Sequence, residues 1–369
     1  MIGKMKSFFK KEIVFCISAA VAVITMFFVA PSAEYIQYID FRVLCLLFCL
    51  MAVVAGFKSV GSFGWLTCQL LSRIKSGRIL CIALVMLPFF SSMLVTNDVA
   101  LLIFIPFTMS LLLELEQEKA IVPVIVLQTV AANLGSMATP VGNPQNLFLY
   151  SKYSLGIADF FSAVLPLTAL SLILLVVFSL RVLPKELQSH KQQIEKISDK
   201  KKLAVYALLF IVCLLTVFRV VPYVVTTALI IAVLLFIDRK LFKEIDFMLL
   251  ATFICFFIIS ENLGRIDGVR VFLQNLLNKN TLLTAVGASQ VISNVPAAVL
   301  LSGFTDDWKS LVMGTNIGGL GTPVASLASL ITLKLYLKAP NGKFAKFMLV
   351  FTAVNVVLLA ALLVFTFVI

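Results

Sequence analysis

Two polar interruptions of nearly the same sequence stand in the middle of long apolar segments. Residues 135–147 read GSMATPVGNPQNL and residues 318–330 read GGLGTPVASLASL, so glycines precede Thr-Pro-Val in both. Proline removes a backbone donor and clashes with the preceding helical turn, and glycine permits the unusual backbone that a break requires. The pattern therefore predicts two helices unwound near their centres. Close packing of small residues between helices is the alternative explanation of the glycines.

A second pair of polar motifs precedes these two breaks. Residues 96–99 read TNDV within the apolar stretch 79–113, and residues 293–296 read SNVP within the stretch 281–304. We expect each stretch to enter the membrane, turn at its Asn motif and leave by the same side, as a re-entrant hairpin. Non-helical backbone at membrane depth is tolerated only where protein covers it or where it lines a cavity. Four breaks in two matched pairs thus predict a binding site where they meet.

The composition indicates a membrane protein. Hydrophobic residues make up 61% of the 369 residues and charged residues 13%, whereas soluble domains are roughly 45–50% apolar. The net charge of +12 arises from Lys and Arg between hydrophobic spans, so we do not expect nucleic-acid binding. The seven cysteines form no CxxC pair, which predicts neither disulfides nor a metal cluster.

The apolar segments predict an all-α polytopic membrane protein with nine full crossings and two hairpins. Two of the crossings, 121–150 and 309–338, contain the Thr-Pro-Val breaks. Segments 62–74 and 265–278 precede the hairpins and are expected to form amphipathic helices on the membrane surface. The uninterrupted crossings are expected at 13–31, 41–57, 159–181, 203–218, 222–237, 246–260 and 345–368.

The placement of Lys and Arg predicts the orientation in the cytoplasmic membrane. A cytoplasmic N-terminus and an external C-terminus leave most of the 30 basic residues in cytoplasmic loops, as the positive-inside rule requires. The segment 13–31 is expected to be a retained span, because about 18 apolar residues exceed the roughly 7–15 of a signal peptide. The basic residues then expected outside are Arg42, Lys152, Arg219, Arg265, Arg270, Lys279 and Lys309.

The matched motifs belong to a longer internal repeat. The sequence IDF leads one span at 39–41 and another at 245–247, and Asn97 matches Asn294 in the same order along the chain. Each copy crosses four times, so the additional helix at 203–218 makes the second copy start from the opposite side. The predicted organisation is a first inverted repeat at 1–181, a cytoplasmic basic linker at 182–202, an extra crossing within 203–221 and a second inverted repeat at 222–369.

The linker contains His190, the only histidine of the chain. A basic, polar stretch between two hydrophobic halves is typical of a solvated cytoplasmic loop. We therefore expect no proton-carrying role for His190.

Polar groups at the breaks predict the chemistry of the site. Helix N-termini attract anions, whereas free carbonyls and helix C-termini attract cations. Amides and hydroxyls beside them suit a small oxyanion together with a coupling ion, although an interhelical hydrogen bond is the alternative for any single Asn or Thr. A coupling sodium ion is expected near Asn97, Thr139, Asn294 and Thr322. The candidate binding residues are Thr96, Asn97, Asp98, Asn133, Gly135, Ser136, Thr139, Pro140, Gly142, Asn143, Ser293, Asn294, Asn316, Gly318, Gly319, Gly321, Thr322 and Pro323.

Asp98 is the most specific single residue of the chain. A carboxylate deep in a span costs about 2.5–3.5 kcal/mol on insertion scales, and such residues mark ion or proton pathways. The second repeat has Val295 at the matching position, so only one half carries the charge. We expect Asp98 to bind the coupling proton or cation. A compatible alternative is that it caps the following helix by accepting from free N–H groups.

The hairpins and breaks resemble those of the ion transporter superfamily, which includes divalent anion/sodium symporters, arsenite efflux permeases and a sodium/proton antiporter branch. In the symporters each hairpin tip holds a Ser-Asn-Thr motif that contacts substrate carboxylate and sodium. Here only the central Asn97 and Asn294 are kept. The Asn-Asp tip and the run GNPQN at 142–146 are more similar to the arsenite permeases. The resemblance implies an elevator-like movement of hairpins and broken helices, and a homodimer.

These features predict a secondary active transporter for a small anion or oxyanion, coupled to a proton or sodium gradient. The sequence contains no P-loop of the form GxxxxGK[ST], so an ion gradient or an accessory subunit must supply the energy. A sodium/proton antiporter, an arsenite-type efflux permease and an ion channel are the alternatives. We expect no cofactor and no enzymatic activity, because no Asp pair, Ser/His pair or HExxH motif is found at membrane depth.

Overall fold

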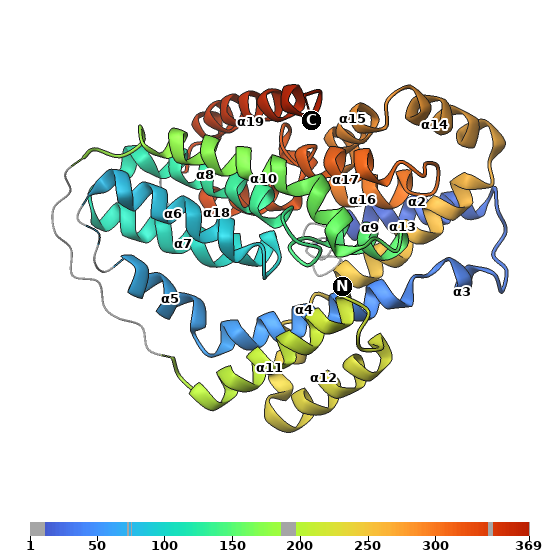
Figure 1. Cartoon of the computed structure of the whole chain (residues 1–369), viewed down its shortest axis with the longest axis horizontal. Helices are drawn as coiled ribbons and strands as arrows, with labels where there is room; N and C mark the ends of the chain where they lie inside the picture. The colour runs from blue at the N-terminus through green and yellow to red at the C-terminus, as the bar shows by residue number, and fades with distance from the viewer. Residues whose placement is uncertain (1–11, 72–73, 75, 186–196, 339–341, 369) are drawn as a thin grey trace, which may run out of the picture.

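The fold is built from helices joined by loops (Figure 1), and the computed structural model describes residues 12–71, 74, 76–185, 197–338 and 342–368. His190 and most of the basic linker lie outside the described residues. The first part contains α2 (Ile13–Met26), α3 (Tyr35–Tyr38), α4 (Phe41–Ser59), α5 (Ser62–Leu71), α6 (Gly77–Ser91), α7 (Asn97–Glu114), α8 (Glu118–Ser136), α9 (Pro144–Lys152) and α10 (Ile157–Ser179). The second part contains α11 (Lys200–Val217), α12 (Tyr223–Ile237), η1 (Arg239–Lys243), α13 (Phe247–Gly264), α14 (Asp267–Lys279), α15 (Thr281–Ile292), α16 (Asn294–Leu301), α17 (Trp308–Ile317), η2 (Pro323–Ala325), α18 (Leu327–Leu337) and α19 (Phe344–Thr366).

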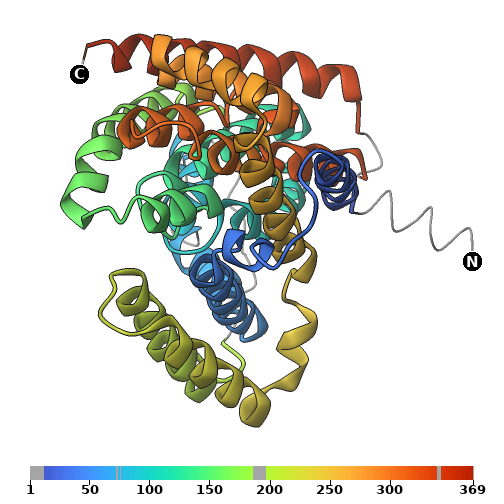
Figure 2. The same ribbon diagram turned by 90° about the vertical axis from the view of Figure 1, so that its right-hand side faces the viewer.

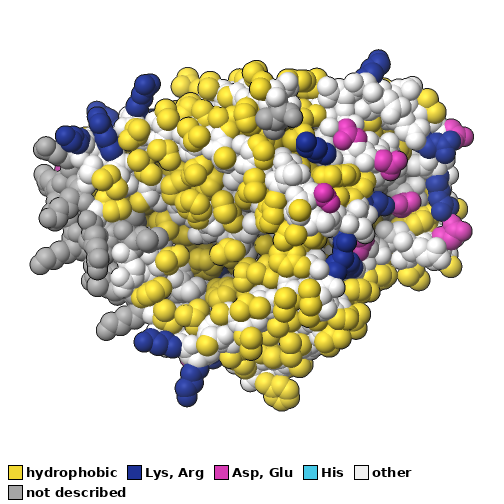
Figure 3. Space-filling model, viewed as in Figure 1, with side chains coloured by type: hydrophobic (Ala, Val, Ile, Leu, Met, Phe, Trp, Pro, Cys, Tyr) yellow, Lys and Arg dark blue, Asp and Glu magenta, His cyan; other side chains and the backbone are white. Residues whose placement is uncertain are grey.

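Six helices within the described ranges are long and apolar enough to cross a membrane, namely α4, α7, α8, α10, α13 and α19. Of the shorter apolar helices, α2, α6, α12 and α18 pack with them, and α15 packs against α16 and α17. Hydrophobic side chains cover a broad zone of the surface in Figure 3, and charged side chains gather toward its two ends. This distribution is that of a polytopic membrane protein. The number of crossings and the orientation stay predictions.

All four polar motifs interrupt helices, as the sequence predicts. α8 ends at Ser136 and α9 begins at Pro144, while α17 ends at Ile317 and α18 begins at Leu327. Residues 92–96 separate α6 from α7, so the motif TNDV lies at the start of α7, and a single residue, Ser293, separates α15 from α16. α6 packs against α7, and α15 packs against α16, so each pair forms a helical hairpin. The helices predicted before the hairpins are present as α5 and α14.

The two hairpins are approached from opposite ends of the molecule. In Figure 1, α5, which leads into α6 and α7, lies at the left end, and α14, which leads into α15 and α16, lies at the right end. α8 is almost wholly buried and packs against α6, α7, α10 and α19. α4 packs against α11 and α12, which lie together on one side of the bundle in Figure 2.

Two glycines of the first break have distinct structural roles. A Cβ on Gly135 would collide with the backbone oxygen of Phe89, so this glycine lets α8 lie directly against α6. A Cβ on Gly142 would collide with the backbone oxygen of Ser136, because the chain folds back on the end of α8 there. Gly135 thus serves close packing, the alternative raised from the sequence, and Gly142 serves the unwound turn.

The close contact at Gly135 yields a stability prediction. We expect Gly135→Ala to lower the free energy of unfolding by about 1–3 kcal/mol, because overpacking forces two helix backbones apart. Thermal unfolding of the detergent-solubilised protein, followed by size-exclusion chromatography, measures the change. Gly287→Ala is the control, since no atom lies within 4 Å of a Cβ at that position in α15. Equal melting temperatures of the two variants would contradict this account of Gly135.

Candidate functional site

The two broken segments are joined by a reciprocal exchange of hydrogen bonds. Asn143 donates from Nδ2 to Oδ1 of Asn316 at 3.1 Å, and Ser326 donates from Oγ to Oδ1 of Asn133 at 3.0 Å. Asn133 and Asn316 stand at matched positions of the two breaks, and so do Asn143 and Ser326. Each break therefore holds the other through the same pair of positions.

Further amide contacts extend this network, and all its side chains are buried. Asn316 donates from Nδ2 to Oδ1 of Asn146 at 2.6 Å and to the carbonyl of Val312 at 2.8 Å. Asn133 donates to the carbonyl of Gly319 at 3.4 Å. Buried amides whose groups are paired in this way hold a fixed arrangement, because leaving one group unpaired costs about 1–3 kcal/mol. The amides at the breaks thus act first as structural ties.

Each hairpin tip donates a hydrogen bond to its own break, and the two acceptors, Gly142 and Ala325, stand at matched positions. The backbone N–H of Asn97 donates to the carbonyl of Gly142 at 3.3 Å, and the hydroxyl of Ser293 donates to the carbonyl of Ala325 at 3.4 Å. The Asn97 side chain also donates to Oδ1 of Asn133 at 2.9 Å. The four breaks consequently form one connected polar core.

Thr139 and Thr322 make equivalent contacts in the two halves. Thr139 donates from Oγ1 to the carbonyl of Met93 at 2.5 Å, and Thr322 donates from Oγ1 to the carbonyl of Gln290 at 3.1 Å. In both cases the acceptor lies three residues before the first residue of the hairpin tip motif. These hydroxyls tie each break to its hairpin, and their predicted proximity to sodium stays a prediction.

Gln290 is a structural residue of the second break that the sequence motifs did not reveal. Its side-chain Nε2 donates to the carbonyls of Gly318 at 2.8 Å and Leu320 at 2.9 Å, and its Oε1 accepts from the backbone N–H of Thr322 at 2.9 Å. The side chain thereby replaces helical hydrogen bonds lost at the break. No pattern indicated it, because the first half has Met93 at the matching place.

Ser293 has an unusual backbone conformation at the second tip. Its φ is 74° and its ψ is 154°, a region that costs a residue with a Cβ about 1–3 kcal/mol. This conformation lets the chain turn between α15 and α16 with Ser293 as the only residue between the two helices. Such strain persists only where the surroundings hold the residue, and it is concentrated at functional sites.

A cavity of about 460 Å³ lies beside this polar core. Residues at the first hairpin tip, the first break, the second hairpin tip and α18 line one side, and residues of α2, α4, α13 and the loop before α13 line the other. Most of its wall is aliphatic, and ligand cavities are typically apolar with a few placed polar groups. The polar and charged lining residues are Glu12, Lys58, Thr96, Asp98, Asn143, Glu244, Asp246, Thr252, Ser293 and Lys334.

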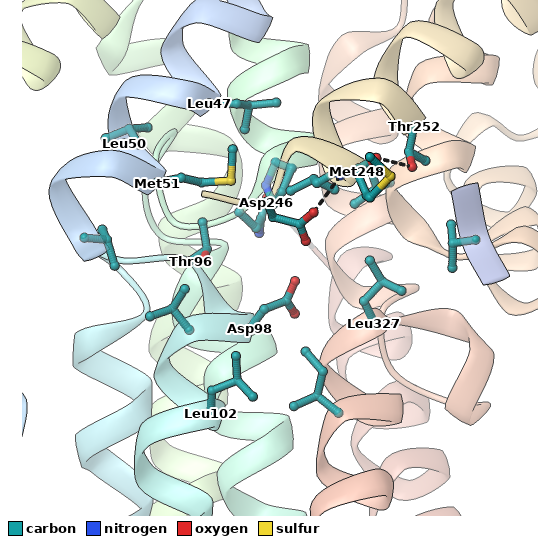
Figure 4. A pocket seen from close by; sticks show the side chains of 18 of the residues that line it. Leu47, Leu50, Met51, Thr96, Asp98, Leu102, Asp246, Met248, Thr252 and Leu327 are labelled. Carbon is teal, nitrogen blue, oxygen red and sulfur yellow. Dashed lines mark hydrogen bonds between the residues drawn. The ribbon is translucent and has the colours of Figure 1, made fainter. Parts of the chain in front are cut away.

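Asp98 points into this cavity toward Asp246 (Figure 4). Its Oδ1 is buried and has no hydrogen-bond partner among the described residues. The backbone N–H of Asp98 donates to Oδ1 of Asn97 at 3.0 Å, so the Asn97 side chain satisfies a free N–H group in the first turn of α7. The unpartnered Oδ1 therefore gives no support to the capping alternative, and ion binding by Asp98 stays a prediction.

Asp246 was noticed in the sequence only as a marker of the repeat. It caps α13 by accepting from the N–H of Leu249 at 2.9 Å, as Asp40 caps α4 by accepting from the N–H of Val43 at 3.0 Å. Of these two caps only Asp246 lines the cavity. The prediction that no Asp pair exists at membrane depth is thus incomplete, because tertiary packing brings a second carboxylate to Asp98.

Two charged residues of the lining, Lys58 and Glu244, form an ion pair. Nζ of Lys58 lies 3.7 Å from Oε2 of Glu244, and both side chains are more than half exposed. An exposed pair of this kind contributes about 0–1 kcal/mol. Lys334 of α18 and Glu12 also line the cavity. In the predicted orientation all four residues lie toward the cytoplasm.

Most of the predicted site residues build the breaks, and four of them line the cavity. The four are Thr96, Asp98, Asn143 and Ser293. Ligand contacts of the remaining candidates stay a prediction. These candidates lie in the tips and breaks behind the cavity wall: Asn97, Asn133, Gly135, Ser136, Thr139, Pro140, Gly142, Asn294, Asn316, Gly318, Gly319, Gly321, Thr322 and Pro323.

Comparison with known proteins identifies related transporters. The chain is 33% identical over 319 residues to the uncharacterized transporter MJ0456 of Methanocaldococcus jannaschii, with 86% of each chain covered. It is 29% identical over 302 residues to the inner membrane protein YbiR of Escherichia coli, with 80% of each covered. A region of 141 residues is 31% identical to the silicon efflux transporter LSI3 of rice, covering 38% of this chain and 29% of that protein.

The family model for the citrate transporters (CitMHS) matches residues 5–305, which include both hairpins and the first break. This match, with the transporter relatives, confirms the resemblance expected from the motifs. The chain belongs to the citrate transporter family of membrane transport proteins.

Proposed function

We propose that this protein is a secondary active transporter that moves a small anion or oxyanion across the cytoplasmic membrane, driven by a proton or sodium gradient. The observation that carries the proposal is the buried Asp98 oxygen, which has no hydrogen-bond partner among the described residues, in a cavity bounded by both hairpin tips and the first break. A carboxylate kept in such a place is costly unless it binds a proton or cation during the cycle.

The cavity supports a small polar substrate. Its volume of about 460 Å³ is within the range of roughly 300–1,000 Å³ typical of small-molecule sites. The hydroxyl of Thr96 can donate to an oxyanion, Asn143 and Ser293 add polar surface to the same lining, and Lys58 and Lys334 supply positive charge. Citrate, after the family description, and silicon or arsenic oxyacids, after the rice relative and the sequence motif, are the substrates to test first.

The two carboxylates give a physical reason for coupling. Like charges that face each other in a protein repel more strongly than they do in water, because the effective dielectric constant is lower. An anion entering beside Asp98 and Asp246 is therefore disfavoured until a proton or cation neutralises part of their charge. Thermodynamic linkage then makes anion binding and cation binding favour each other. Sodium/proton antiport remains the second candidate, because the same carboxylates suit exchange of two cations.

The arrangement also supports an elevator-type movement. The amide network ties the hairpins and broken helices into one unit, and the cavity separates this unit from α4 and the start of α13. Displacement of the unit along these helices would carry the site across the membrane. Four charged residues at the edge of the cavity lie on the predicted cytoplasmic side, namely Glu12, Lys58, Glu244 and Lys334. The conformation described therefore corresponds to a cytoplasm-facing state in this proposal.

Transport by the purified protein tests the proposal directly. We expect saturable uptake of one member of a panel of citrate, silicic acid, arsenite, sulfate and dicarboxylates into proteoliposomes, dependent on an imposed pH or sodium gradient. Flux that does not saturate and ignores both gradients would instead indicate a channel. Sodium efflux driven by a pH gradient, with no member of the panel transported, would favour the antiporter.

Removing the charge of Asp98 tests the coupling role. Asp98→Asn should reduce gradient-driven uptake at least about tenfold, because the variant cannot take up the coupling ion. It should still elute as a folded protein, since an amide fits the same space. Uptake that remains coupled in this variant would remove Asp98 from the mechanism.

Two amides of the network should respond differently to truncation. Asn143→Ala and Asn146→Ala should both lower the melting temperature, because each leaves buried partners unpaired at about 1–3 kcal/mol. Only Asn143 lines the cavity, so only its variant should also raise the KM for substrate, by about tenfold. Equal KM changes in both variants would show that Asn143 acts through the fold alone.

A further inference from the structure

A second carboxylate faces Asp98 from a different part of the fold. Figure 4 shows the carboxylates of Asp98, in the first turn of α7, and Asp246, at the start of α13, pointing toward each other within the cavity. The Asp98 Oδ1 is buried and has no partner among the described residues. Aliphatic side chains such as Leu50 and Leu327 line the space around the pair. The Asp98 oxygen in these surroundings lacks the solvation that water would provide, whereas Asp246 is an exposed residue that reaches the same cavity.

The capping role of Asp246 does not explain its position. Its Oδ1 accepts from the N–H of Leu249 at 2.9 Å, which satisfies that oxygen. Asp40 makes the same contact with Val43 at the matched start of α4. A cap alone requires only an oxygen at the helix start, and Asn serves as well as Asp in that role. What distinguishes Asp246 from Asp40 is that it lines the cavity and faces another carboxylate.

Among the described residues of the lining, the other charged groups do not cancel the charge of this pair. Lys58 is engaged at the rim with Glu244 at 3.7 Å, so the two together add no net charge. Lys334 contributes one positive charge and Glu12 one negative charge to the lining. With Asp98 and Asp246 the ionised lining carries an excess of two negative charges. One bound monovalent cation would halve that excess at the place where the two carboxylates meet.

We infer that Asp98 and Asp246 together form a binding site for one monovalent cation, a proton or a sodium ion, so that the coupling site is shared between the first hairpin and the start of α13. This inference rests on the proposed function and adds the second residue of the site. Neutral oxygens for a sodium ion are available on Thr96, Asn143 and Ser293 in the same lining. A proton would be held by the Asp98 oxygen, because an Asp246 oxygen already accepts a backbone hydrogen bond.

The shared site has a mechanical consequence. Asp98 belongs to the hairpin unit that is proposed to move, whereas Asp246 belongs to the helix start beside which it would move. The cation site between them is complete only in the conformation described here. Its release would accompany separation of the two carboxylates, which gives ion binding a differential affinity for the two states, as coupling requires.

Cation binding can be measured on the purified protein without any substrate. A ligand that binds only the folded state raises its melting temperature. We therefore expect the melting temperature of the unmodified protein to rise by at least about 2 °C in one of two comparisons. The first adds sodium chloride in place of choline chloride at fixed pH, and the second lowers the pH without sodium. The sodium arm and the pH arm distinguish the two cations.

Matched variants identify the residues responsible. Asp246→Asn and Asp40→Asn each replace a helix cap by another good cap and remove one charge. Asp40→Asn should keep the cation-dependent change, and Asp246→Asn and Asp98→Asn should each lose at least about half of it. If the protein folds but shows neither dependence, or if Asp246→Asn behaves like Asp40→Asn, the shared site is overturned. The readout needs no transport, so failure of the uptake panel with a retained cation response would overturn the proposed substrate class only.

Discussion

The reciprocal hydrogen bonds between the two broken segments are the interaction on which the rest of the structure depends. Asn143 donates to Asn316 and Ser326 donates to Asn133, at matched positions of the two breaks. A broken helix buried in an apolar bundle has backbone groups that no water can satisfy, so it is stable only beside polar partners. Each break supplies these partners to the other. The two breaks are therefore stable together, and they bring the hairpin tips to the same place.

The cavity follows from this arrangement, because the polar core occupies one of its sides and aliphatic residues of α4 and α13 the other. The hydroxyls and amides give it hydrogen-bonding groups, and the facing carboxylates give it excess negative charge. Anion transport requires that this charge be neutralised, which is a reason for coupling to a cation.

Much of the fold could be predicted because the signals are local. Glycine and proline in apolar runs predicted the interruptions of α8–α9 and α17–α18, and the Asn motifs predicted the turns between α6 and α7 and between α15 and α16. Gln290 and Ser326 escaped prediction, since each acts through contacts with residues about 30 to 190 positions away. Thr139 and Thr322 were predicted as binding residues, but their hydrogen bonds to carbonyls of the hairpins became evident only in the tertiary structure.

The sequence by itself determined that this is a helical membrane protein with four interrupted segments and one carboxylate, Asp98, inside a hairpin. These properties depend on composition and on residues near each other in the chain, where apolar length and helix-breaking chemistry act directly. Only the tertiary structure decided that Asp246, and not its repeat partner Asp40, faces Asp98. The sequence around both residues is alike, Ile-Asp-Phe, and both cap a helix through the same local contact. Which of the two lines a cavity depends on how distant helices pack, and no local pattern encodes that.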